Sequence, residues 1–147
     1  METVEYEFTV PFAPHAWQRP GETRDGRRFD TTANKEAKRI IAMVARAAGV
    51  KPIQGAVELR ATFLFRRPKT HLKKNGDLRK GVPVHHIHNP DVSNLTKLVE
   101  DALIGIAFKD DRQIIANHVK KDWTTEGDSM SVITLVGLEK QEEINRE

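Results

Sequence analysis

Carboxylates and a lysine gather in a stretch of this chain where simple packing would require no charge. Asp91 follows Pro90, and Lys97 lies further along the chain. Asp110 and Asp111 then follow as an acid pair. Carboxylate oxygens are the ligands that hard divalent cations prefer, and an ammonium group can stabilise negative charge that develops on a phosphate. These residue types are suited to metal-assisted hydrolysis of a phosphodiester.

One amphipathic helix is predicted to position these residues. Pro90 blocks helix on its N-terminal side, and either Asp91 or Ser93 can cap the helix. The helix is expected to run to about Ile104, where Gly105 ends it. Apolar residues recur along this segment at three- and four-residue spacings and form one core stripe: Leu95, Leu98, Val99, Ala102, Leu103 and Ile106.

A polar stripe lies beside the apolar one. Asn94, Lys97 and Asp101 recur at helical spacing and share one side of the helix. The acid pair then opens an alternating run over residues 114–119, which predicts a strand. We therefore expect Asp91 in the turn, Lys97 on the helix and the acid pair to lie close together at one site.

Each of these residues also has an ordinary structural interpretation. Asp91 alone can be a helix cap, and the acid pair alone can be a turn between a helix and a strand. Lys97 can form an ion pair with Asp101 on a solvated helix face. Their occurrence together favours a functional site.

The same residues resemble the signature of the RusA family of Holliday junction resolvases. That signature can be written Pro-Asp-x-Asp-Asn-x-x-Lys, then a helical Asp, Asp-Asp-x-Gln-Ile or Val, and a basic strand end. The chain departs from it at Ser93, where the family has its second turn aspartate. The matching residues are Pro90, Asp91, Asn94, Lys97, Asp101, Leu103, Gly105, Asp110, Asp111, Gln113, Ile114 and Lys120.

The resemblance implies a structure-selective endonuclease that depends on Mg²⁺, with Mn²⁺ as a possible substitute, and needs no small-molecule cofactor. Such an enzyme resolves four-way DNA junctions by paired symmetric nicks in recombination and repair, which implies a homodimer. A prophage origin would fit. The resemblance implies that Asp91, Asp111 and Asp110 bind metal, that Lys97 binds phosphate, and that Asp101 and Asn94 support them.

Ser93 leaves three outcomes open, because a hydroxyl is a weaker ligand for a hard cation than a carboxylate. Catalysis could be slower with weaker metal binding, Asp101 or Asp110 could replace the missing charge, or cleavage could be lost while junction binding remains. A further alternative is a coincidental metal site on a domain that acts on another anionic substrate.

Basic residues cluster in three places, which favours binding to nucleic acid because neutralised phosphates release counterions. Solvated loops are the alternative for each cluster. The candidate DNA-binding residues are Arg19, Arg27, Arg28, Lys69, Lys73, Lys74, Lys120 and Lys121.

Trp17 could stack on an unpaired base or anchor its loop to the core. His86 and His88 are expected on one face of a short strand, where they could bind a transition metal or phosphate, or simply be partly exposed.

Composition narrows the class of protein. The 147 residues fit one domain, and the absence of cysteine excludes a disulfide scaffold and a cysteine nucleophile. No apolar run could span a bilayer, and the acidic N-terminus does not resemble a signal peptide. A cytoplasmic location, in a bacterial or phage-infected cell, is expected.

The order of predicted elements indicates an α+β domain over residues 1–138, in which a mixed sheet packs against two principal helices. A charged tail, residues 139–147, is expected to fray. The predicted strands cover residues 4–10, 57–65, 84–88, 112–123 and 130–138, and a second helix covers residues 34–48.

Overall fold

Alternating apolar and polar residues build one four-stranded sheet in this protein. The structure is a computed structural model that describes residues 3–124 and 126–138. The sheet consists of β1 (Val4–Val10), β4 (Val57–Arg66), β5 (Ile114–Thr124) and β6 (Met130–Gly137), in the order β1-β6-β4-β5. β6 pairs antiparallel with β1 and β4, whereas β4 pairs parallel with β5. The sheet is therefore mixed, as predicted.

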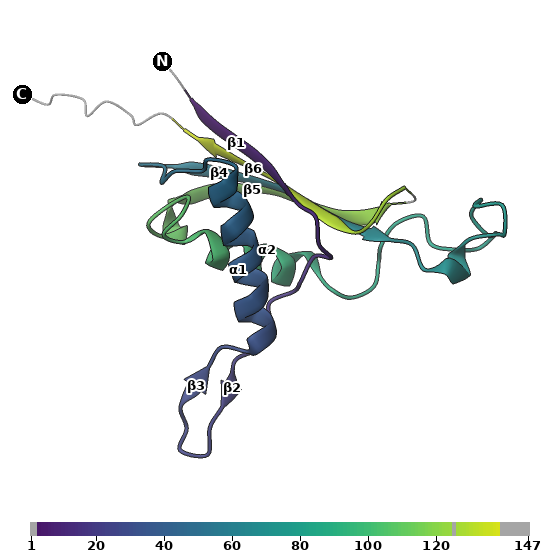
Figure 1. Cartoon of the computed structure of the whole chain (residues 1–147), viewed down its shortest axis with the longest axis horizontal. Helices are drawn as coiled ribbons and strands as arrows, with labels where there is room; N and C mark the ends of the chain where they lie inside the picture. Colours follow the sequence, from purple (N-terminus) through teal and green to yellow (C-terminus); the bar gives the residue numbers. More distant parts are fainter. Residues whose placement is uncertain (1–2, 125, 139–147) are drawn as a thin grey trace, which may run out of the picture.

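Two helices cover the same face of this sheet (Figure 1). α1 (Thr32–Ala47) begins after Thr31, whose side chain caps it, and α2 (Val92–Leu103) begins after the capping residue Asp91. The predicted α+β class, with two principal helices on a mixed sheet, is confirmed. The opposite face of the sheet carries no helix (Figure 1).

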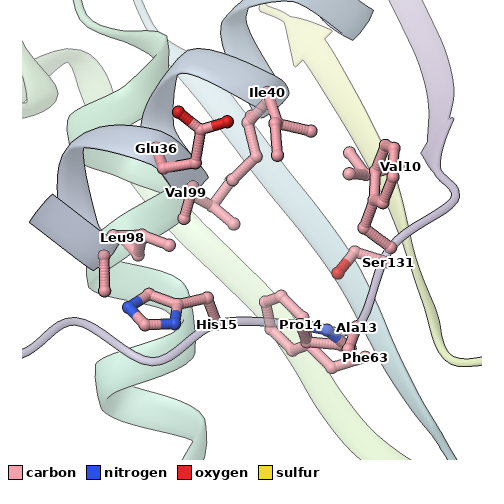
Figure 2. A pocket seen from close by; sticks show the side chains of 14 residues that line it. Val10, Ala13, Pro14, His15, Glu36, Ile40, Phe63, Leu98, Val99 and Ser131 are labelled. Atoms are coloured by element: carbon pink, nitrogen blue, oxygen red, sulfur yellow. The ribbon is translucent and has the colours of Figure 1, made fainter.

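The hydrophobic core lies between the sheet and the helices. Its largest fully buried side chains come mainly from β4, α2 and β6: Leu59, Phe63, Leu95, Leu98, Leu103, Ile133 and Leu135. An apolar pocket of about 250 Å³ opens at the edge of this layer, between α1 and the segment that follows β1. Figure 2 shows Ile40 and Val99 on its wall, with His15 and Glu36 as its titratable groups. With so few polar groups, the pocket does not offer the chemistry predicted for the acidic stretch.

A buried asparagine fixes the connection between β1 and α1. Asn34 is fully buried, and its Oδ1 accepts from the Gln18 N–H at 2.9 Å. Its Nδ2 donates to the Gln18 carbonyl at 2.8 Å and to Asp30 Oδ1 at 3.0 Å. Between these two partners the chain forms a small hairpin, β2 (Gly21–Glu22) and β3 (Arg28–Phe29), that projects beyond α1 (Figure 1). One amide therefore holds both legs of the hairpin.

Two local expectations were wrong. The loop predicted between β1 and α1 contains the β2–β3 hairpin, and residues 84–88 form no strand. The Arg67 side chain occupies two backbone acceptors at the start of that segment. Its guanidinium donates to the carbonyls of Pro83 and Val84 at 2.8 and 3.0 Å, so these carbonyls are engaged by a side chain and not by a neighbouring strand. The other predicted elements are present, with ends shifted by at most about two residues.

Within the described residues, no helix is both long and apolar enough to cross a membrane. The predicted tail, residues 139–147, lies outside the described residues.

Replacing Asn34 with Ala should lower the free energy of unfolding by about 1–3 kcal/mol, because it removes the hydrogen bonds that the fully buried amide makes to Gln18 and Asp30. Denaturant unfolding followed by circular dichroism measures the change. Lys35→Ala, at the neighbouring exposed position of α1, is the control and should stay within about 0.5 kcal/mol of the native chain. An equal loss in both variants would contradict the role given to the amide.

Candidate functional site

A hollow of about 400 Å³ lies between α2 and β5. Ser93, Lys97 and Asp101 line it from α2, and Asp111 lines it from the short helix η2 (Asp111–Gln113) that precedes β5. The structure thus brings four of the predicted residues to one place. The other lining residues are Val92, Thr96, Glu100, Asn117 and Val119.

The ammonium group of Lys97 rests on an aromatic ring. Its Nζ lies 3.6 Å from the centroid of the Trp17 ring, a cation–π contact. The backbone N–H of Trp17 donates to the Asn94 carbonyl at 2.9 Å, which ties the loop to the first turn of α2. Trp17 also packs against the core. These contacts favour the anchoring role of Trp17 and give Lys97 a defined position at the hollow.

Glu100 adds a carboxylate to the hollow. Its Oε1 accepts from Asn117 Nδ2 on β5 at 3.1 Å. Burial raises the pKa of the Glu100 carboxyl, the Asn117 hydrogen bond opposes the rise, and the charges of Asp111 and Asp101 add to it. Negative charge on this side chain is therefore disfavoured unless a cation compensates it.

Asp101 experiences the same competition between burial and charge. Burial raises its pKa, the cations Lys38 and Lys97 oppose that rise, and Asp111 and Asp30 reinforce it. Lys38 comes from α1, where it pairs with Asp30. The charge of Asp111 on η2 thus raises the pKa of both acids on α2 across the hollow.

Asp91 lies at the N-terminal end of α2 and is exposed. Its Oδ1 accepts from the Asn94 N–H at 2.8 Å, so it caps the helix, and it does not line the hollow. The turn before it is held from β5, because Lys121 Nζ donates to the Pro90 carbonyl at 2.8 Å and also to the His88 carbonyl. Lys121 therefore supports the Asp91 turn.

The acid pair divides into two roles. Asp111 faces the hollow, whereas Asp110 caps η2, accepting from the Arg112 N–H at 2.8 Å and pairing with the Arg112 guanidinium at 3.0 Å. These Arg112 contacts lower the pKa of Asp110. The Gln113 side chain completes the capping box. Asp110 is thus engaged in local structure.

No group of three or more imidazole or carboxylate side chains within residues 3–124 and 126–138 is arranged to hold a metal ion. Mg²⁺ commonly binds through one or two carboxylates, with water and substrate phosphate completing its coordination. The residues around Asp111 fit that sparse mode of binding.

Most of the predicted DNA-binding residues are exposed. Lys121 is the exception, since it is partly buried against the Asp91 turn. The exposed ones are Arg19, Arg27, Arg28, Lys69, Lys73, Lys74 and Lys120. Lys69, Lys73 and Lys74 belong to a long loop between β4 and α2 that projects from the body of the protein (Figure 1).

An aromatic cluster closes the base of this long loop. The His86 ring centroid lies 4.6 Å from that of Phe65 and 4.2 Å from that of Trp123, and the histidine is buried. Burial lowers the pKa of His86, and the Lys121 charge lowers it further. His88 is exposed, so the expected pairing of the two histidines on one strand face was wrong.

Sequence reasoning missed Glu100 and Asn117. Ser93, Lys97 and Glu100 follow one another at four- and three-residue spacings, which is the helical pattern that could have identified Glu100. Asn117 could not be found in this way, because its role depends on the pairing of β5 beneath α2.

The sequence of the chain is similar to those of known proteins. Residues 11–132 match the family model described as "Endodeoxyribonuclease RusA". The chain is also 32% identical over 127 residues to "Uncharacterized protein YqaN" of Bacillus subtilis (strain 168), an alignment that covers 82% of this chain and 89% of that protein.

Glu100→Gln should make the folded protein more stable at neutral pH. Because folding raises the Glu100 pKa, its contribution to the free energy of unfolding is complete below pH 4.5 and is lost as pH rises through the folded-state pKa. The glutamine side chain carries no charge, so the variant should avoid this loss. We expect its free energy of unfolding at neutral pH to exceed that of the native chain by about 1 kcal/mol or less, because the Glu100 side chain is only partly shielded from water. Denaturant unfolding from pH 4 to pH 8 measures it, with the exposed Glu22→Gln as control. If the free energies of unfolding of the variant and the native chain change in parallel across this pH range, the charge of Glu100 does not destabilise the folded protein.

Lys121→Met should loosen the Asp91 turn, because it removes two hydrogen bonds from a charged donor. We expect the Asn94 amide, which bonds to Asp91, to exchange with solvent about tenfold faster, as measured by NMR hydrogen exchange. Lys51→Met, at an exposed position away from the site, should leave that rate unchanged. Unchanged exchange in Lys121→Met would show that the turn does not depend on this lysine.

Proposed function

Because this chain belongs to the RusA family of endodeoxyribonucleases, a family that acts on branched DNA junctions, we propose that it is an Mg²⁺-dependent endonuclease that resolves four-way junctions by paired nicks. The observation that carries this proposal is the hollow that Lys97 shares with Asp101 and Asp111. An acidic recess beside a fixed ammonium group suits a divalent cation and a phosphate.

The proposed metal ligands are Asp111 from the hollow and Asp91 from the adjacent turn. Nucleases of this family generally depend on divalent metal ions, and the donor oxygens here are of the hard type that Mg²⁺ and Mn²⁺ accept. A bound ion would supply a Lewis acid beside the scissile phosphate. Asp110 takes the capping role described above and supports the site through η2.

The chain's own groups account for phosphate binding and for charge control. Lys97, held over Trp17, would bind a phosphate oxygen and stabilise the negative charge that increases during cleavage. Glu100 and Asp101 have raised pKa values and would lose their protons more readily when a cation enters. Metal binding and carboxyl ionisation are therefore coupled at this site.

Ser93 sets the strength of the proposed activity. Its side chain lines the same hollow as Asp111, so an aspartate there would add a carboxylate to the cation-binding set. Glu100 lies about two turns further along α2 and supplies a carboxylate to the same hollow. We propose that the chain retains cleavage with a greater demand for metal.

The DNA-binding surface would be formed by the long loop and the β2–β3 hairpin. Lys69, Lys73 and Lys74 on the loop, with Arg27 and Arg28 on the hairpin, are exposed and could neutralise phosphates of the junction arms. Two symmetric nicks need two sites related by a two-fold axis, so the active species is proposed to be a homodimer working in the cytoplasm of a bacterial or phage-infected cell.

A junction-binding protein without cleavage activity is the second candidate function. It is favoured by Ser93 and by the absence, within the described residues, of three grouped metal-ligating side chains. Such a protein would bind branched DNA equally well with and without Mg²⁺.

Cleavage of a mobile synthetic four-way junction, with Mg²⁺ or Mn²⁺, tests the proposed function. The native chain should make paired nicks, Asp91→Asn and Asp111→Asn should each reduce the rate about a hundredfold or more, and Ser93→Asp should raise it. Denaturing gels measure the nicks, and gel-shift titration measures binding, which all variants should retain.

Asp128→Asn, which changes an exposed acid outside the site, is the matched control and should cut at the native rate. Binding without cutting by the native chain, with activity only in Ser93→Asp, would support the second candidate. A native chain that neither binds nor cuts the junction would overturn the proposed function.

A further inference from the structure

Within the described residues, the two most exposed large apolar side chains lie in one short segment at the end of the long loop. Val84 and Ile87 are 74% and 73% exposed, and the segment leads directly to the turn that carries Asp91. A single exposed apolar side chain is common on a protein surface. Two of them close together, just before a proposed metal ligand, indicate a surface that contacts a partner.

Contacts from β4 and β5 fix the backbone on the N-terminal side of Ile87. The Arg67 guanidinium donates to the Val84 carbonyl at 3.0 Å. The His86 side chain is buried, and its ring centroid lies 4.2 Å from that of Trp123. Ile87 therefore follows directly after an anchored residue, although its own side chain is exposed to solvent.

Lys121 fixes the backbone on the C-terminal side of Ile87. Its Nζ donates to the carbonyls of His88 and Pro90. A segment that is anchored on both sides loses little conformational entropy when its exposed side chain binds a partner. Ile87 is thus an apolar group held in one place before its partner arrives.

The short distance along the chain keeps Ile87 near the proposed site of cleavage. Asp91 is the fourth residue after it, so the two Cα atoms lie at most about 14 Å apart. Successive bases of one DNA strand are spaced by about 3.4 Å along the helix axis. Ile87 would therefore reach bases within about four steps of the phosphate that is cut.

The residues around Ile87 indicate that its partner is DNA. The same loop carries the exposed cations Lys69, Lys73 and Lys74, which suit phosphates. Isoleucine is one of the apolar side chains that DNA-bending proteins insert between base steps, where it partly unstacks the bases. Cations on the loop with an apolar side chain at its anchored end are therefore suited to hold DNA by its backbone and to open one base step.

We propose that Ile87 inserts between bases at the branch point of a DNA junction and so selects branched over linear DNA. Unstacking costs least where the bases are already disturbed, as they are where strands exchange between helices. Phosphate contacts, in contrast, are made with any DNA and do not select the branch point. The inference rests on the proposed function, since it assigns the substrate preference of the same site.

Ile87→Thr tests this role, because threonine keeps the β-branched shape and replaces an apolar surface with a hydroxyl. Gel-shift titration without Mg²⁺ compares a four-way junction with a linear duplex of the same sequence. The fluorescent base 2-aminopurine at the branch point reports unstacking. The native chain should increase this fluorescence on binding, whereas Ile87→Thr should not. The preference for the junction should fall at least about tenfold in Ile87→Thr, and Ile87→Leu should retain both properties.

Two further variants are the controls. Met43→Ala, at an exposed apolar position of α1, should leave the junction preference and the fluorescence unchanged. Lys73→Ala should weaken binding to the junction and to the duplex by similar factors, because a phosphate contact does not distinguish them. Circular dichroism verifies that each variant is folded.

Native junction preference or a native fluorescence increase in Ile87→Thr would overturn the inference, as would an equal loss of affinity for both DNAs. Sedimentation velocity adds a further test. A change of assembly state in Ile87→Thr, with its junction preference intact, would assign Ile87 to a contact between copies of the chain and also overturn the inference.

Cleavage of the same junction with Mg²⁺ separates this inference from the proposed function. A junction preference that depends on Ile87, in a native chain that does not cut, would keep the inference and overturn the nuclease. Cleavage by a native chain whose preference does not depend on Ile87 would keep the nuclease and overturn the inference.

Discussion

The parallel pairing of β5 with β4 is the constraint on which the rest of the site depends. It fixes which β5 side chains face the helices, and a slip of one residue would turn each of them to the opposite face. In the observed register, Asn117 reaches Glu100 on α2 and Lys121 reaches the carbonyls of the turn before Asp91. The same strand thus connects the acidic hollow with the turn that starts α2. Its other face carries Lys120 to the uncovered side of the sheet.

The acids of the hollow and the nearby lysine influence one another's charge. Glu100 and Asp101 resist ionisation because they are partly buried and face Asp111, while Lys97 is fixed over an aromatic ring at the same hollow. A site of this kind gains stability when a cation and a phosphate enter together, since each neutralises part of the other's charge. The local structure around it is built by caps, with Asp91 on α2 and Asp110 on η2. Asp91 therefore combines a capping contact with its proposed role as a metal ligand, whereas Asp110 is engaged in local structure alone.

Much of the fold followed from sequence pattern, because amphipathic spacing and capping residues act locally. The helix after Pro90, its cap at Asp91 and the convergence of Lys97 with Asp111 could all be predicted. The separation of Asp110 from Asp111 could not, because it depends on hydrogen bonds to Arg112 and Gln113 in η2. The role of Lys121 depends on tertiary contact, as does the loss of the strand expected at residues 84–88.

The most direct test of this account is the position of a bound ion. Anomalous diffraction from crystals soaked in Mn²⁺ would locate it without relying on activity. The account predicts one peak beside Asp111, within reach of the turn that carries Asp91, and a loss of that peak in Asp111→Asn. A peak among the histidines of the long loop, or none near α2 at millimolar Mn²⁺, would contradict the assignment of this hollow as the catalytic centre.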